Sequence, residues 1–187
     1  MNSIEQIITF WFGERDSDIF GNFRIEWFKK SDEFDAEIRN KFSTLHQQAC
    51  SGKLDDWLTS PEGALALIII LDQFSRNMFR NSPKAFAADP QALTIAKNAI
   101  NAGFHNQVHP VMQTFFFLPL EHSENLEDQQ QCVALFEKSG NTNGLTWAID
   151  HLKIIQRFGR FPHRNKILGR VSSKEEEEFL KQPGSSF

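Results

Sequence analysis

The densest group of basic side chains in the sequence lies between Arg157 and Arg170, in the stretch RFGRFPHRNKILGR. It contains four arginines, one lysine and one histidine, and it contains no carboxylate. A guanidinium group binds a phosphate or a carboxylate through two parallel hydrogen bonds, so three of these arginines have the chemistry of an anion clamp. The side chains that we expect to bind a ligand here are Arg157, Arg160, His163, Arg164 and Asn165.

A second polar group follows a long apolar run, in the stretch LDQFSRNMFR from Leu71 to Arg80. Asp72 and Arg76 are four residues apart and therefore share one face of a helix. Polar groups at the end of a buried helix must be satisfied. Asp72, Arg76 and Asn77 therefore form either one wall of a polar pocket or an ion-pair group that ties neighbouring helices together.

The stretch PLEHSEN brings a histidine and a carboxylate to a junction between two helices. His122 titrates near neutral pH, and Glu124 has the chemistry to orient it or to act with it in acid–base catalysis. With His151, these are the candidate catalytic residues. The alternative is that His122 and Glu124 only stabilise helix ends.

Three functions remain open for these groups. The first is a structural network in which Asp72, Arg76 and the later charged residues hold helices in register. The second is a binding module with a basic and polar pocket for a small anionic ligand or an acidic peptide. The third is a hydrolase or lyase that acts on an anionic metabolite, with a His–Glu acid–base pair and an arginine clamp. All three require the separate segments to meet, and Asp72 is expected to lie close to Arg160.

Several familiar sites have no counterpart in the sequence. It contains no glycine-rich phosphate loop, no HExxH motif, no nucleophile elbow and no metal-type His/Cys spacing. We therefore predict no metal site, and no cofactor is indicated.

The charge distribution bears on the partner. The formal net charge of −4 is uneven: residues 151–174 hold seven Lys/Arg and no acid, which leaves 13 basic against 24 acidic residues elsewhere. This acidic body argues against nucleic acid as the partner.

The longest apolar run is too short to span a bilayer, and two isolated cysteines suit a reducing compartment. We expect a cytoplasmic protein without membrane contact; its oligomeric state is not predicted.

Helix signals occur along the whole chain. Ser31 and Ser60–Pro61 are helix starts, Asn125 begins a further helix, and Gly140 and Gly159 are helix ends. Pro119 is expected to end the helix that starts at Pro110. No stretch alternates with a period of two residues, so we predict an all-α protein with about eight helices in one domain over residues 1–187. The short connections favour antiparallel pairs.

Three stretches together resemble the bacterial domain-of-unknown-function 924 family: LDQFSRNMFR, FFFLPLEHSE and HLKIIQRFGRFPHRNKILGR. The resemblance runs in order from about Trp11 to the C-terminus. It implies a tetratricopeptide-like, right-handed superhelical array of helices, and it implies no activity, substrate or catalytic residue. One departure is Ser75, where the family commonly has proline.

Overall fold

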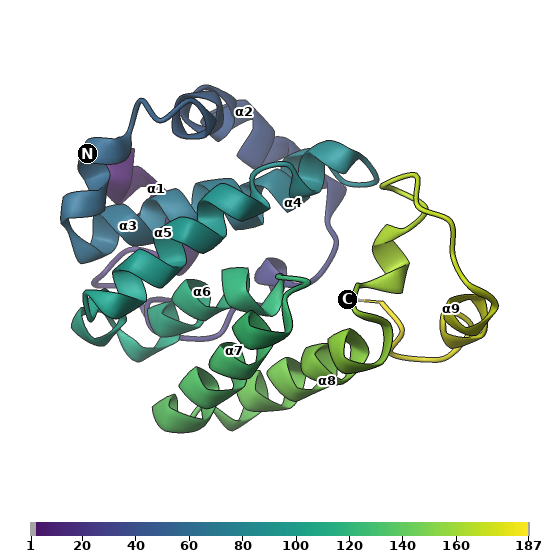
Figure 1. Ribbon diagram of the computed structural model, residues 1–187. Helices are drawn as coiled ribbons and strands as arrows, with labels where there is room; N and C mark the ends of the chain where they lie inside the picture. Colours follow the sequence, from purple (N-terminus) through teal and green to yellow (C-terminus); the bar gives the residue numbers. More distant parts are fainter. Residues whose placement is uncertain (1–2, 187) are drawn as a thin grey trace. The chain divides into compact units, whose positions relative to one another are not determined.

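The computed structural model describes residues 3–186, and in this range it contains helices and no β-strand (Figure 1). The α-helices are α1 (Ser3–Phe12), α2 (Asp32–Cys50), α3 (Pro61–Ile68), α4 (Ser75–Met78), α5 (Asp89–Asn101), α6 (Pro110–Glu121), α7 (Leu126–Ser139), α8 (Thr142–Phe158) and α9 (Lys174–Phe179). The all-α fold class is thus confirmed, whereas the tetratricopeptide-like superhelix stays a prediction. Within residues 3–186, none of the helices has both the length and the apolar character that crossing a membrane requires.

Most helix ends lie where the sequence predicts them. The Ser31 and Ser60 side chains accept hydrogen bonds from the first-turn N–H groups of α2 and α3. Asn125 does the same for α7. Gly140 and Gly159 follow α7 and α8 with φ values of 73° and 67°, in the left-handed conformation that glycine adopts most readily.

The prediction that Pro119 ends its helix is wrong, because α6 continues to Glu121. A proline near the last turn removes only one N–H hydrogen bond. Its neighbours Leu118 and Leu120 are buried and keep this part of the helix packed. The Gln129 side-chain amide donates to the carbonyls of Leu120 and Glu121, so the extended end of α6 has its polar groups satisfied.

The chain forms two compact units. Unit 1 comprises Met1–Arg80 and Lys84–Pro119, and unit 2 comprises Asn81–Pro83 and Leu120–Phe187. The boundary falls within α6. The expectation of a single domain over residues 1–187 stays a prediction.

Unit 1 is built around an apolar helix and an aromatic cluster. The residues of α3 are buried from Gly63 onward, and burial continues through a π-helical stretch, Ile69–Phe74. Aromatic rings from four parts of the unit pack next to it: Trp11, Trp27, Phe34, Phe42, Phe74 and Phe115. This core fixes the connection between α1 and α2, because the Trp27 indole N–H donates to the Trp11 carbonyl at 2.9 Å.

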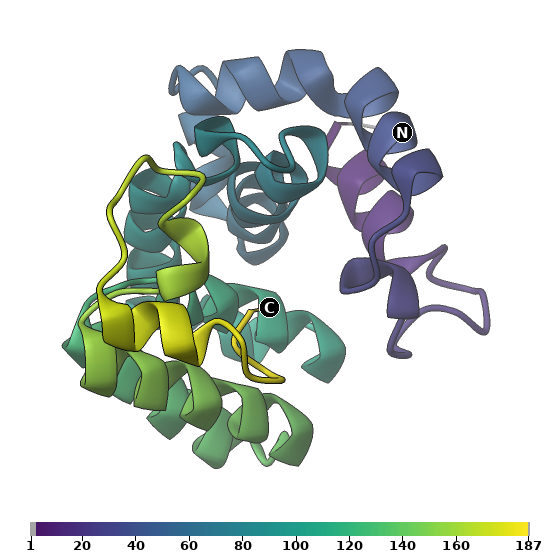
Figure 2. The ribbon, with the colours of Figure 1, turned by 90° about the vertical axis from the view of Figure 1, so that its right-hand side faces the viewer.

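Unit 2 consists of a helical hairpin with a C-terminal segment packed against it. Helices α7 and α8 are joined by Gly140 and Asn141 and lie side by side in both views (Figures 1 and 2). Helix α9 lies over α8, and the Phe158 and Phe179 rings are 5.0 Å apart. The segment between α8 and α9, residues 159–173, contains most of the basic stretch that the sequence singles out.

Candidate functional site

The predicted face shared by Asp72 and Arg76 is present in unit 1. Asp72 is fully buried on the π-helical stretch, and its Oδ1 lies 3.0 Å from Arg76 Nη1. Arg76 also forms a bidentate pair with Asp89, at 2.9 and 3.1 Å. Burial works against the charged guanidinium, but the two carboxylates outweigh it and raise the pKa of Arg76. The pair with Asp89 links α4 to the start of α5.

Asn77 and Asp72 bind different residues. Its side-chain amide donates to Asp35 Oδ1 at 2.7 Å, and Arg80 binds both oxygens of the same carboxylate. Asp35 is buried on α2. These bonds tie α2 to the end of α4, which matches the interpretation of this segment as an ion-pair group between helices.

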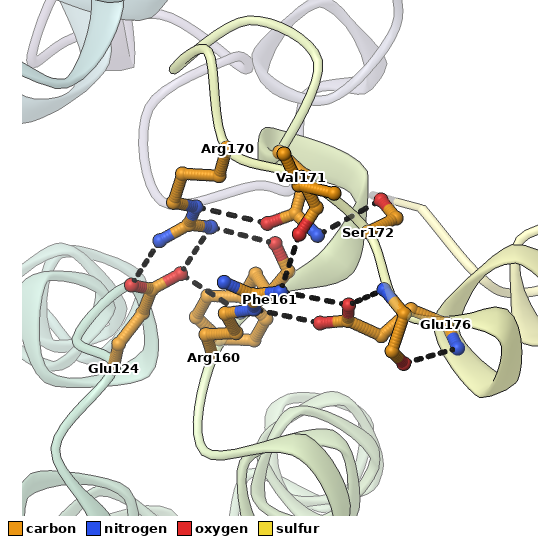
Figure 3. A network of polar contacts seen from close by, with 9 residues as sticks. Glu124, Arg160, Phe161, Arg170, Val171, Ser172 and Glu176 are labelled. Atoms are coloured by element: carbon orange, nitrogen blue, oxygen red, sulfur yellow. Dashed lines mark hydrogen bonds and ion pairs between the residues drawn. The ribbon is translucent and has the colours of Figure 1, made fainter.

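In unit 2, Glu124 is the centre of a polar network (Figure 3). Its two oxygens accept from Arg170 at 2.7 and 2.9 Å, and Oε1 also accepts the Phe161 backbone N–H at 2.8 Å. Burial raises the pKa of Glu124, but the Arg170 and Phe161 hydrogen bonds outweigh it, so the pKa is lowered overall. With three donors in place, this carboxylate is held in its ionised form.

Arg160 belongs to a second bidentate pair, with Glu176 of α9. Its Nε and Nη2 donate to the two oxygens at 2.7 and 2.8 Å. Glu176 also accepts the Ser173 N–H in the capping box of α9. The Arg160 hydrogen bond, aided by this cap, lowers the pKa of Glu176 to about 2. The third arginine, Arg157, pairs with Glu175 on the exposed surface.

The loop from Asn165 to Ser172 is closed by the same network. Arg160 Nη2 donates to the Val171 carbonyl at 2.9 Å, and Arg170 Nε donates to Asn165 Oδ1 at 2.9 Å. The Asn165 amide in turn donates to Ser172 Oγ at 3.1 Å. These contacts across the base of the loop hold its backbone in one shape (Figure 3).

Two histidines lie beside the buried guanidinium of Arg164, which stacks on the Phe161 ring at 4.5 Å. Burial lowers the pKa of His151 to about 3, and the neighbouring positive groups add to this effect. Burial and the charge of Arg164 lower the pKa of His163 to about 4. Both imidazoles are therefore neutral at pH 7. His151 Nδ1 donates to the Trp147 carbonyl at 2.9 Å, and the Glu121 carboxylate is 3.7 Å away.

The structure brings the PLEHSEN stretch and the basic stretch together within unit 2. Glu124 contacts the backbone of Phe161, and the charges of His122 and Arg164 act on His151. The expected meeting of Asp72 with Arg160 joins the two units and stays a prediction. Within residues 3–186, no three His, Cys, Asp or Glu side chains are placed to share a metal ion.

Sequence reasoning missed several partners of these residues. They are Asp35, Arg80, Asp89, Arg170 and Glu176. Of these five, only Glu176 could be placed from the sequence. Its position in the capping box puts its carboxylate next to the backbone of Ser173.

A serine–histidine pair in unit 1 was not visible in the sequence either. Ser75 Oγ lies 2.8 Å from His46 Nε2, and both side chains are buried. Burial lowers the pKa of His46. The pair joins α2 to α4 and gives the Ser75 hydroxyl a buried partner.

A group of exposed apolar side chains lies on the connection between α1 and α2. Four side chains there are more than half exposed: Ile19, Phe23, Ile25 and Phe28. The Phe23 and Phe28 rings stack at 5.8 Å. Together with Asp18 and Glu26, the first three line an open groove of about 600 Å³, hereafter the Phe23 groove. In Figure 2 this connection forms loops that extend beyond α1 and α2.

Comparison with known proteins agrees with the resemblance seen in the sequence. The model of a family described as "Bacterial protein of unknown function (DUF924)" matches residues 7–184. A solved structure, "Structure of Protein of Unknown Function ATU0120 from Agrobacterium tumefaciens", is 36% identical and has a TM-score of 0.86; the match covers 95% of this chain and 96% of that chain. A search of curated proteins finds no match.

Proposed function

We propose that this chain, which belongs to the bacterial DUF924 family of unknown function, is a protein-binding module whose contact surface is the Phe23 groove. The observation that carries the proposal is the exposure of Phe23 and Ile25, at 62% and 61%. Contiguous exposed apolar side chains with a polar rim mark interaction surfaces in soluble domains.

The charges around the groove define the partner. Residues 13–28 contain four acidic side chains, Glu14, Asp16, Asp18 and Glu26, all exposed. The two arginines of this segment are engaged. Arg15 pairs with Glu62, and Arg24, which also lines the groove, binds the carbonyls of Phe10 and Trp11 and lies 3.8 Å from the Glu26 carboxylate. The surface is therefore apolar and acidic, and it complements a protein segment that is apolar and basic.

The backbone under the groove is held firmly, which suits a binding surface. Arg24 Nη1 donates to the Phe10 and Trp11 carbonyls at 2.8 and 2.9 Å. Trp27 is buried between Trp11 and Phe115. Because these anchors fix the loop before a partner arrives, binding does not have to order the loop.

We expect a peptide of alternating leucine and lysine to bind the chain, and the matching leucine–glutamate peptide not to bind. Phe23→Ser should weaken binding of the lysine peptide at least about fivefold, since truncating an aromatic anchor typically costs more than 1 kcal/mol. Fluorescence anisotropy with labelled peptides measures both effects. Raising the salt concentration should also weaken binding, because exposed charges are screened.

The matched control is Trp147→Ser. Trp147 is an exposed aromatic residue on α8, 50% accessible, and is not part of the groove. This variant should bind the lysine peptide like the unaltered chain. Equal loss in both variants, or equal binding of both peptides, would contradict the proposed surface.

The basic stretch supports a second candidate function, the binding of a small anion at Arg164. Arg157 and Arg160, also predicted to hold an anion, are occupied by Glu175 and Glu176. Arg164 lies beside His151 and His163, whose pKa values are lowered by burial and by its charge. An anion here would oppose that charge and favour protonated imidazoles. The enzyme alternative gains no support, because three donors occupy the oxygens of Glu124.

If an anion binds at Arg164, it must bind more tightly as the pH falls, because binding and proton uptake are linked. Phosphate or citrate should then raise the melting temperature more at pH 6 than at pH 8, and Arg164→Met should remove this difference. A thermal-shift series at constant ionic strength measures it. A rise that is independent of pH, or one that persists in Arg164→Met, would rule out the site.

A further inference from the structure

A second exposed apolar feature lies in unit 2, on the loop Lys166–Val171. Val171 is 88% exposed, the highest value among the large apolar residues of the described chain. Leu168 and Lys166 are exposed on the same loop. Val171 and Leu168 thus give this loop two exposed apolar side chains next to a lysine.

The polar network of unit 2 holds this loop in a defined shape. Arg160 donates to the Val171 carbonyl, and Arg170 bridges Glu124 and the Phe161 carbonyl at the base of the loop. The Arg170 N–H donates to the Asn165 carbonyl at 2.8 Å. Two bidentate arginine–carboxylate pairs thus support one short loop, and its side chains are presented with little conformational freedom to lose on binding.

The loop and the Phe23 groove are complementary in chemistry. The loop has two basic residues and no acid, and its tip carries exposed apolar side chains. The groove is lined by Ile19, Phe23 and Ile25 between Asp18 and Glu26. Phe23 is exposed within unit 1 and Val171 within unit 2, so neither surface is covered by its own unit.

We infer that the occupant of the Phe23 groove is the Lys166–Val171 loop of a second copy of this chain. This inference rests on the proposed function and names the partner. Leu168 and Val171 meet Phe23 and Ile25, while Lys166 faces the carboxylates of Asp18 and Glu26. A pair in which each copy's loop occupies the other's groove uses the contact twice and leaves neither surface exposed.

Because the contact is small, we expect a dissociation constant above about 1 µM. Sedimentation velocity over a concentration range from about 10 µM to 1 mM brackets it. We expect the unaltered chain to change from monomer to a larger species within this range. Phe23→Glu and Val171→Glu should each remain monomeric, and circular dichroism should show that both keep their helices because both positions are exposed.

Mixing the two variants gives the decisive result. Phe23→Glu retains an intact loop and Val171→Glu retains an intact groove, so an equimolar mixture should form a one-to-one complex although neither variant self-associates. A charge exchange tests the electrostatic part: Glu26→Lys and Lys166→Glu should each weaken self-association, and the double variant should recover it.

Three outcomes overturn the inference: an unaltered chain that stays monomeric up to 1 mM, variants that associate like it, or a mixture that does not associate. The proposed function fails separately, when the leucine–lysine peptide does not bind the groove. A monomeric chain that still binds this peptide through Phe23 therefore removes self-recognition and leaves the binding module standing.

Discussion

Replacing Glu124 with alanine should lower the free energy of unfolding by about 2–4 kcal/mol, because it leaves a guanidinium and a backbone N–H without their acceptor. The guanidinium is that of Arg170, bound at 2.7 and 2.9 Å, and the N–H is that of Phe161. In a chain of this length the change corresponds to a drop of about 4–16 °C in melting temperature. Denaturant unfolding followed by circular dichroism measures the free energy directly.

Two further variants separate the network from a general effect of lost charge. Glu124→Gln keeps one acceptor oxygen and loses the charge, so its loss should lie between those of the unaltered chain and Glu124→Ala. Glu175→Ala removes an exposed pair with Arg157 and should cost less than about 1 kcal/mol. If Glu124→Ala and Glu175→Ala cost the same small amount, the network in Figure 3 is not a structural clasp.

The sequence predicted the helices well because their signals are local. Ser31, Ser60 and Asn125 satisfy N–H groups two or three residues away, and glycine after α7 and α8 needs no distant partner. The exception, Pro119, shows the limit of such signals. Its effect was outweighed by Gln129, which satisfies the end of α6 from another helix.

The partners of the candidate site residues were not predictable in the same way. The basic stretch was correctly identified as unusual, but 24 acidic residues were available to its arginines. Glu124 and Arg170 are 46 residues apart, and one carboxylate is chemically like another, so only the fold decides which pair forms. Arg170 of the basic stretch binds Glu124 of HSE, whereas Arg160 binds Glu176 in the last helix, which the sequence did not indicate as its partner.

The exposed apolar surfaces escaped prediction for a different reason. Phe23, Ile25 and Val171 have the residue types of a core, and nothing in a sequence distinguishes an apolar side chain that is buried from one that faces solvent. The proposed function and the inference drawn from it therefore depend on the structure alone.

Lowering the pH from 7.5 to 5 should destabilise the chain by about 4 kcal/mol through two histidines of unit 2. In the folded chain the pKa values of His151 and His163 are lowered to about 3 and about 4, mainly by burial. In the unfolded chain each has a pKa of about 6.5. The unfolded state therefore binds more protons, and the stability present above pH 6.5 is lost as the pH falls toward the folded values.

The size of the effect follows from this difference. At pH 5 each unfolded imidazole is almost fully protonated and each folded one is not, which costs about 2 kcal/mol per histidine. The charged and titratable groups around them are Glu121, His122, Glu124, Arg164 and Arg170. The Glu121 carboxylate, 3.7 Å from His151, favours protonation in the folded chain, so 4 kcal/mol is an upper value.

The carboxylates of the network affect the stability mainly at a lower pH than the histidines do, because they take up protons in a lower range of pH. The pKa values of Glu124 and Glu176 are lowered from 4.5, so the stability that they contribute is present above about pH 4.5 and is lost below it. Denaturant unfolding between pH 5 and 7.5 therefore reports the histidines.

Substituting each histidine in turn shows which imidazole causes the loss of stability at low pH. His151→Gln and His163→Gln should each reduce the loss between pH 7.5 and 5 by about 2 kcal/mol, because each removes one protonation that is coupled to unfolding. His46, whose pKa is also lowered by burial, contributes to the loss that remains. A stability that is flat over this range, or a slope that survives both substitutions, would mean that the two imidazoles are already charged in the folded chain.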